Sequence, residues 1–359
     1  FTRRPYHLTL AESDWNSFRL DQSYDAVVPA LLSAEAETGI GVSVRRRWAA
    51  AFPRDWHPQK VSLKIDLNEF TAEDADGNPV CDGDHGFVAP CVESWHGLKK
   101  LSLENGDDMN VVTEGFAWYL NRLASENSAF DYTPGLAAWI RLFITTTNAN
   151  GSIVETFYNG VFVNVEQRDK QFLKNHGLWA GSDDTWLYKY SDRWAPNAKE
   201  APEDAQGNPV HSPFFLESLY HEPFQPCDIA TLLPAGPCDP LPTGDAFVAA
   251  LDATMNTQSL LVLGAVSGFL VSGDDLFSKG KNFYQVEYSD TAIGRREYIQ
   301  WDLDSAMAAL KTNRSIYEQA GRRNGEYEVA ILGNPVLRQR YTDTMRALLD
   351  GPLEERALL

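Results

Sequence analysis

The chain has 359 residues, enough for one large domain or two ordinary ones with a real core, which excludes a peptide or a small disulfide knot. Its 31 Lys and Arg residues against 50 Asp and Glu give a formal charge of −19 at pH 7. Because nucleic acids and anionic membranes attract basic surfaces, this charge argues against binding to either. The longest apolar run, 260–271, is shorter than the roughly 20 residues of a spanning helix, so we expect no membrane span.

The first part of the chain predicts strands arranged around one helix. Alternating apolar residues or runs of β-formers mark strands at 6–10, 42–46, 60–67, 98–103, 138–147 and 153–166. The last two form a long antiparallel run that we expect to break at Asn150-Gly151 and at Asn159-Gly160. The apolar residues of 108–124 fall mainly on one stripe, which is typical of a helix.

After residue 167 the pattern favours helices. Segments 245–255 and 259–271 are helical candidates, and the second is apolar all round, which is typical of a buried helix. Another helix is predicted over 336–350, because Asn334-Pro335 supplies a cap and a first-turn proline and Gly351 follows its end. We therefore expect an α+β protein with a strand-rich part at 1–165 and a helix-rich part at 166–359.

Four cysteines form two pairs along the chain. Cys81 and Cys91 are 10 positions apart, Cys227 and Cys238 are 11 apart, and each pair brackets a loop rich in Gly, Pro and Asp. Pairing of neighbours closes short loops and is typical of an exported protein, so we expect two disulfides and a secreted or cell-envelope location. Reduced thiols and a zinc site are the alternatives, although neither pair has the short gap typical of zinc ligands.

One short segment occurs twice, since Glu73–Val80 and Glu203–Val210 agree at seven of eight positions, 130 residues apart. The flanking sequences do not repeat, which argues against a solenoid. We interpret both copies as tight Gly-Asn turns on surface loops. The acidic residues of the first copy are similar to a calcium loop, but the glycine and closing glutamate of an EF-hand are not at their positions, so the turn is favoured.

Acidic and amide side chains gather around one predicted strand pair after the most apolar helix. Asp274, Asp275 and Asn282 lie in the polar loop that follows this helix, and the strand pair then leads to Asp302. The two strands are predicted at 283–288 and 297–301. If the second strand continued, Asp302 and Asp304 would point to the same side, because side chains alternate along a strand.

This group of side chains suits a cation. Clustered carboxylates repel one another unless a cation holds them. Magnesium takes one or two carboxylates and completes its shell with water and substrate phosphate, so two aspartates and an asparagine predict a nucleotide–metal site. The alternative is that Asp304 caps a helix and that residues 274–275 form an ordinary solvated turn.

These residues are part of a longer resemblance. Three segments carry it near the predicted site: an Asp-containing loop at 274–275, an Asn-aromatic-Tyr sequence at 282–284 and a Trp-Asp-x-Asp sequence at 301–304. Other recognisable segments precede them, at 6–15, 60–65, 98–103, 108–117, 159–173 and 187–189. In this order they resemble the spore-coat protein H (CotH) kinase family over most of residues 1–317. The resemblance implies a two-lobed, atypical protein-kinase-like fold that transfers phosphate from ATP, with Mg or Mn, to Ser or Thr of a protein.

The resemblance also implies roles for residues of the strand-rich lobe. A kinase needs a lysine that is paired with a helix glutamate. The family pattern favours Lys60 as this lysine and Glu114 as its partner. Lys64 is the alternative to Lys60, because the two lysines share one face of the predicted strand. Glu166, in the segment that joins the lobes, is also expected to contact the nucleotide.

For the helix-rich lobe, the resemblance implies that Asp275 is the catalytic aspartate, with Asp274 as the alternative because alignment across the loop could slip by one. Asn282 and Asp302 are then metal ligands, and Asp304 assists. The spacing departs from ordinary protein kinases. Asp275 and Asn282 are 7 positions apart rather than about 5, and the Asp-Phe-Gly motif is missing.

A second departure concerns the phosphate loop of the family, which corresponds here to residues 44–50. Arg45 and Arg47 are kept as phosphate-binding candidates, whereas Trp48 replaces a glycine. Glycine allows backbone amides to approach phosphate closely, so either the arginine side chains bind phosphate or nucleotide binding is impaired. An inactive pseudokinase that serves as a surface adhesion or assembly module is therefore the alternative. A carbohydrate-associated enzyme is a further one, suggested by 10 Trp, 14 Tyr and paired acids.

Overall fold

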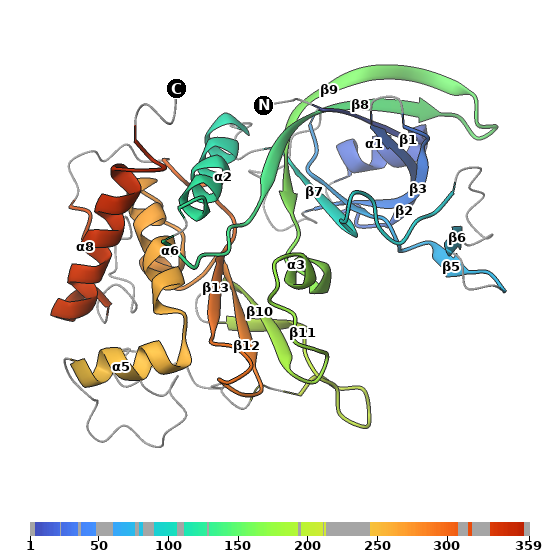
Figure 1. Ribbon diagram of the computed structural model, residues 1–359. Coiled ribbons are helices and arrows are strands. Elements are labelled where there is room, and N and C mark those ends of the chain that lie inside the picture. The colour runs from blue at the N-terminus through green and yellow to red at the C-terminus, as the bar shows by residue number, and fades with distance from the viewer. Residues whose placement is uncertain are drawn as a thin grey trace. The chain divides into compact units, whose positions relative to one another are not determined.

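The computed structural model describes residues 4–21, 23–34, 37–47, 60–75, 79–81, 90–105, 111–127, 129–192, 195–210, 212, 245–307, 315–317 and 331–354. The chain forms two compact units, one from Phe1–Gly115 with Leu136–Gln167 and the other from Phe116–Gly135 with Arg168–Leu359. Helices and sheets occur together, as expected of an α+β protein (Figure 1).

The first unit is built on a sheet of seven strands that closes on itself in the order β1-β2-β3-β4-β7-β9-β8. Its strands are β1 Arg4–Ala11, β2 Val28–Ala34, β3 Ile40–Arg46, β4 Leu63–Asp66, β7 Lys100–Glu104, β8 Ala137–Thr147 and β9 Ile153–Glu166. Alternate side chains such as Leu8, Leu32, Leu63 and Leu101 are fully buried in its core. The closure joins β1 and β8 in parallel, and the other neighbours are antiparallel.

Most predicted strands of this unit are confirmed, with two corrections. The predicted break at 159–160 is a bulge inside one continuous strand, because Leu142 pairs with Gly160 and Phe143 with Tyr158. The predicted strand at 60–67 begins only at Leu63, so Lys60 precedes it. Strand β2 was not predicted.

Two smaller features complete the first unit. Helix α1, Glu12–Leu20, buries Trp15 and Phe18. The hairpin of β5, Thr71–Glu73, and β6, Pro79–Cys81, ends at a disulfide between Cys81 and Cys91, which confirms one predicted pair. Cys227 and Cys238 lie outside the described residues.

Helix α2, Val111–Ser125, confirms the predicted helix and begins beside β8. The indole Nε1 of Trp139 on β8 donates a hydrogen bond to the carbonyl of Val111 at 2.9 Å. Gly115 is required here, because a Cβ atom at this position would collide with the Trp139 ring. The contact therefore fixes the first turn of α2, which carries Glu114.

The second unit contains an antiparallel sheet in the order β11-β10-β12-β13. Its strands are β10 Thr185–Asp192, β11 Ala195–Glu200, β12 Phe283–Tyr288 and β13 Glu297–Gln300. All residues of β12 and β13 are buried. The strand pair β12–β13 confirms the prediction, whereas β10 and β11 were not predicted in a part expected to be mostly helical.

Five helices are formed by the described residues of this unit after 167. They are α3 Lys170–Asn175, α5 Asp245–Thr254, α6 Thr257–Phe269, α7 Leu276–Lys279 and α8 Pro335–Leu349. Helix α6 is buried on nearly all sides and packs against both α8 and β13, as its uniformly apolar sequence predicts (Figure 1). Asn334 caps α8 by accepting hydrogen bonds from the backbone of Val336 and Leu337, which confirms the predicted start.

The second copy of the repeated segment is a turn. The Asp204 carboxylate accepts hydrogen bonds from the backbone N–H groups of Gln206 and Asn208, which favour its ionised form and lower its pKa. Gly207 has φ +80°, the left-handed conformation that suits glycine. The prediction of a turn is confirmed at this copy, while residues 76–78 of the first copy lie outside the described ranges. Among the described helices, none has the length and apolar character needed to cross a membrane.

Candidate functional site

In the first unit, Lys60 is held in place by Asn105. Lys60 donates a hydrogen bond from Nζ to the carbonyl of Asn105 at 3.1 Å, and Asn105 donates from Nδ2 to the carbonyl of Lys60 at 2.8 Å. The ammonium group also lies 4.9 Å from the ring centroid of Phe162, and the lysine stem lies against Gly160. The position of this charge is therefore set by Asn105, directly after β7, and by residues of β9.

The charge of Lys60 is coupled to Glu114. Burial lowers the pKa of Lys60 to about 8, and the nearby negative charge of Glu114 acts in the opposite direction. Glu114 is itself buried in the first turn of α2. The two residues matched to the kinase lysine and glutamate thus interact electrostatically within one unit.

Lys64 differs from Lys60. It lies in the middle of β4, opposite Arg45 on β3 and Ser102 on β7. The expectation that both lysines share a strand face is wrong, because Lys60 lies before the strand begins. Lys60 lies within the electrostatic reach of Glu114.

The arginines of β3 have different surroundings. Arg45 is exposed, whereas Arg46 is buried and donates a hydrogen bond to the carbonyl of Asp21 at 2.8 Å. Arg47 forms an ion pair with the buried Glu104. Arg45 therefore has the more accessible guanidinium group, while Arg47 is engaged by a protein carboxylate. Trp48 lies outside the described residues.

Glu166 is the last residue of β9 and is buried. Its backbone N–H donates a hydrogen bond to the carbonyl of Leu136 at 2.9 Å. This places it at the end of the first unit, directly before the chain enters the second.

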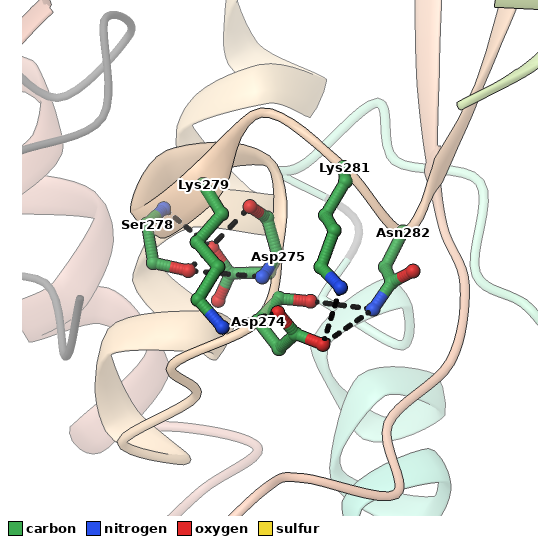
Figure 2. Close-up of polar contacts among 6 residues, drawn as sticks. All are labelled: Asp274, Asp275, Ser278, Lys279, Lys281 and Asn282. Atoms are coloured by element: carbon green, nitrogen blue, oxygen red, sulfur yellow. Dashed lines mark hydrogen bonds and ion pairs between the residues drawn. The ribbon is translucent and has the colours of Figure 1, made fainter. Parts of the chain in front are cut away.

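In the second unit, Asp275 is the buried N-cap of α7. Its Oδ1 accepts a hydrogen bond from the backbone of Ser278 at 2.8 Å, and its own N–H donates to the Ser278 hydroxyl at 2.9 Å (Figure 2). The side chain is fully buried, and this burial raises the pKa of Asp275. These contacts form a capping box, which gives Asp275 a clear structural role.

The neighbouring Asp274 has a different environment. Its carboxylate forms ion pairs with Lys279 at 2.6 Å and with Lys281 at 3.0 Å, and its side chain is 21% exposed. Asn282 donates from Nδ2 to the carbonyl of Asp274 at 2.8 Å and to its Oδ2 at 3.1 Å. Figure 2 shows the Asp274 side chain among these three residues, while Asp275 turns toward Ser278.

Asn282 stands at the start of β12 in a left-handed conformation, with φ +58°. Its backbone is held on both sides, because its N–H donates to the carbonyl of Tyr190 at 2.7 Å and its carbonyl accepts from Trp301 at 3.1 Å. The amide oxygen points away from Asp274 (Figure 2). The amide oxygen therefore takes no part in the contact with Asp274.

Asp302 lies beyond the end of β13 and also has a left-handed conformation, with φ +57°. The strand ends at Gln300, so the expected alternation through Asp304 is wrong, and Asp304 lies in the turn 304–307. No described residue forms a hydrogen bond or an ion pair with the Asp302 carboxylate. A non-glycine residue in this conformation costs about 1 kcal/mol or more, and such conformations concentrate at functional sites.

Asn282 and Asp302 belong to the same end of one strand pair. Phe283 pairs with Gln300, and the next backbone contact joins Trp301 to Asn282. The described part of the chain contains no group of three His, Cys, Asp or Glu residues suited to a metal ion. Magnesium needs fewer protein ligands when phosphate completes its shell, so one amide oxygen and one unengaged carboxylate fit it.

Sequence reasoning missed several residues of these sites. Lys279 and Lys281 flank the loop glycine beside Asn282, and this basic pattern was visible in the sequence. Asn105 carries no pattern that would distinguish it. Arg168 is buried among aromatic rings of the second unit, and a single arginine after a strand gives no signal of such a position.

Many of the aromatic residues that the structure describes belong to the core. Trp15, Trp118, Trp186 and Trp301 are almost completely buried, as are several tyrosines of the second unit. This distribution gives little support to a carbohydrate-binding surface.

Comparison with known families agrees with the resemblance seen in the sequence. A family model described as CotH kinase protein matches residues 147–358, which is more than half of the chain. The match contains the loop of Asp274, the strand pair β12–β13 and Asp302. No curated protein matches the chain.

Proposed function

Because the chain belongs to the CotH kinase protein family, we propose that it transfers the γ-phosphate of ATP to Ser or Thr of an extracellular or surface protein. The observation that carries the proposal is the hydrogen-bonded pair of Asp274 and Asn282, which lies at the end of the strand pair that leads to Asp302. A phosphotransferase needs an acid that orients the acceptor hydroxyl and an Asn–Asp pair that holds the metal. Each requirement has a candidate here.

We assign the acceptor-orienting role to Asp274 rather than Asp275. Asp274 is partly exposed and hydrogen-bonded to Asn282, whereas Asp275 is buried and caps α7. A base must reach the hydroxyl proton directly or through one water molecule, and a partly exposed carboxylate meets this requirement more readily than a fully buried cap. In the proposed reaction, the Asp274 carboxylate accepts the acceptor hydroxyl proton.

Asn282 and Asp302 would hold magnesium or manganese, with Asp304 two positions further along. When bound, the metal neutralises charge on the transferring phosphate. Lys60 would bind the ATP phosphates, and Glu114 keeps it protonated by raising a pKa that burial lowers. Arg45 is exposed and could add a further phosphate contact.

An inactive pseudokinase is the second candidate, because one observation favours it. The Asp274 carboxylate is engaged by two lysines, which must release it before it can accept a proton. An active kinase therefore requires that substrate or phosphate displaces Lys279 or Lys281. The experiment below separates the two candidates.

The test is an assay with [γ-³²P]ATP, magnesium or manganese, and the purified chain, with autophosphorylation and a Ser/Thr-rich protein as readouts. We expect metal-dependent label on Ser or Thr, lost in Asp274→Asn. Label that persists in Asp274→Asn would refute the assigned role. Metal-dependent ATP binding without any transfer would favour the pseudokinase.

We further propose that the protein works in a secreted or envelope-exposed location. The disulfide between Cys81 and Cys91 supports this, because structural disulfides persist in oxidising compartments. Fractionation of the producing cell, combined with thiol labelling, tests the proposal. Recovery of the protein from the cytoplasm with both cysteines free would contradict it.

A further inference from the structure

Arg168 occupies a cage of aromatic rings inside the second unit. Its guanidinium carbon lies 4.7 Å from the ring centroid of Trp118 on α2, 4.9 Å from that of Trp301 and 5.5 Å from that of Phe172 on α3. Only 3% of the residue is exposed. Gly135 lines the same place, where a Cβ atom would collide with the guanidinium group. Arg168 is thus enclosed by elements from three parts of the chain.

The same guanidinium group holds the backbone at the end of β13. Its Nη2 donates a hydrogen bond to the carbonyl of Gln300 at 3.3 Å. The next residue, Trp301, donates its N–H to the carbonyl of Asn282 and accepts a hydrogen bond from the Gln300 side chain at 3.1 Å. Arg168 therefore contacts both residues that directly precede Asp302, one through its backbone and one through its ring.

The backbone conformation of Asp302 requires support from the surrounding structure. Its left-handed φ of +57° is unfavourable for a residue with a side chain, and no described residue engages its carboxylate. A strained conformation persists only where the surrounding structure determines it. The support must therefore come from the backbone on either side, and on the N-terminal side it comes through Gln300 and Trp301.

We propose that Arg168 is a positioning residue for the metal site, because it fixes the 300–301 backbone so that Asp302 is presented in its left-handed conformation. The metal-binding part of this inference rests on the proposed function. The geometric part does not, since it concerns only the conformation of the chain.

Arginine suits this role better than lysine does. A planar guanidinium can stack on ring faces and donate a hydrogen bond from its edge at the same time, whereas an ammonium group is a compact charge without a plane. Arg168→Lys keeps the charge and the approximate length but loses the combined geometry. It is therefore the most informative variant, and exposed Arg340, whose ion pair with Asp252 joins α8 to α5, offers Arg340→Lys as the matched control.

The test is amide hydrogen exchange over a peptide covering residues 298–303, in the whole chain without metal or nucleotide. In Arg168→Lys we expect exchange at Trp301 to become about tenfold faster, because the local structure opens more often. Arg340→Lys should exchange like the wild type. Unchanged exchange in a folded Arg168→Lys protein would overturn the inference, whatever the protein does with ATP.

A Mg²⁺ titration in the presence of ATP, with the shift in melting temperature as the readout, tests whether Arg168 affects metal binding. We expect Arg168→Lys to need about tenfold more Mg²⁺ for the half-maximal shift, the range seen when residues supporting metal ligands are changed. Faster exchange with an unchanged Mg²⁺ requirement would overturn the link to metal binding. The remaining outcome is faster exchange in Arg168→Lys together with a wild type that shows no metal-dependent shift. This result would refute the proposed function but leave the geometric role of Arg168 intact.

Gly135→Ala provides a second route if Arg168→Lys fails to fold. The added Cβ would collide with the guanidinium group and with the Trp118 ring, so it should displace Arg168 from the cage without removing its charge. The same acceleration of exchange at 298–303 is expected, and its absence in folded Gly135→Ala would contradict the inference.

Discussion

The Asn282 side chain donates hydrogen bonds to both the carbonyl and the carboxylate of Asp274, at 2.8 and 3.1 Å. These contacts join the loop after α7 to the loop before it. They hold Asp274, the candidate acid, directly against Asn282, the candidate metal ligand. Asp275, the adjacent residue, takes no part in them and caps α7. The two aspartates therefore have separate roles.

This separation predicts different defects for the two aspartates. Asp274→Asn should lower phosphate transfer by about 100-fold or more, because it removes the proton acceptor, while nucleotide binding remains. Asp275→Ala should lower the free energy of unfolding by about 1–2 kcal/mol through loss of the cap. Transfer kinetics and chemical denaturation of each variant measure the two effects. Full activity in Asp274→Asn with loss in a stable Asp275→Ala protein would reverse our assignment.

Lys60 predicts a pH dependence of ATP binding. Its pKa of about 8 means that its charge is lost as pH rises through 8, well before an exposed lysine titrates. ATP affinity should therefore fall between pH 7 and 9 in the wild type, and Lys60→Arg should remove most of this change. Lys64→Ala serves as the control and should keep it. A wild-type affinity that is flat over this range would contradict a phosphate-binding role for Lys60.

Glu297 predicts a pH dependence of stability. Burial raises the pKa of Glu297 to about 7, and Asp131 adds to the increase, while Asn256, Ser259 and Arg295 oppose it. Because the folded-state pKa is raised, its contribution is complete below the unfolded pKa near 4.5 and is lost as pH rises through 7.

Glu297→Gln should then raise the free energy of unfolding at pH 8 by on the order of 1 kcal/mol and flatten its change between pH 5 and 8. The amide retains a group that can contact Asn256, which donates to Glu297 at 2.7 Å. Urea denaturation at several pH values measures this. A variant with the wild-type pH profile would show that Glu297 does not titrate in this range.

Val271 lies in the left-handed region with φ +50°, at the end of α6 and just before the loop of Asp274. This conformation is unfavourable for a β-branched residue and suits glycine. Val271→Gly should therefore raise the free energy of unfolding by about 1 kcal/mol. Equilibrium denaturation tests this, and a loss of stability would show that the packing of the valine side chain outweighs the strain.

Local signals account for the parts of the fold that the sequence predicted well. Asn334, Pro335 and Gly351 mark α8 because capping depends on neighbours in the chain. Strand β10 escaped prediction because nearly all side chains of 185–190 are buried, so that alternation between polar and apolar positions is missing.

The sequence predicted which residues belong to the candidate site but not the orientation and contacts of their side chains. Whether Asp274 or Asp275 faces outward depends on one residue of loop geometry, because Asp275 caps α7 and Asp274 directly precedes it. The left-handed φ of Asp302 arises from tertiary contacts, including those of Arg168, and short-range sequence patterns do not record them. Pairing of Lys60 with Glu114 was suggested by resemblance alone, because the residues are far apart in the sequence.

The most direct test of the account is the melting temperature of the protein with and without Mg-ATP, measured for wild type and Asp302→Ala. A ligand that binds only the folded state raises the melting temperature by mass action. We predict a rise at millimolar Mg-ATP for the wild type that requires the metal, and no rise for a folded Asp302→Ala protein. A wild type without a metal-dependent rise, or an Asp302→Ala protein that responds as the wild type does, would contradict a nucleotide–metal site at Asn282 and Asp302.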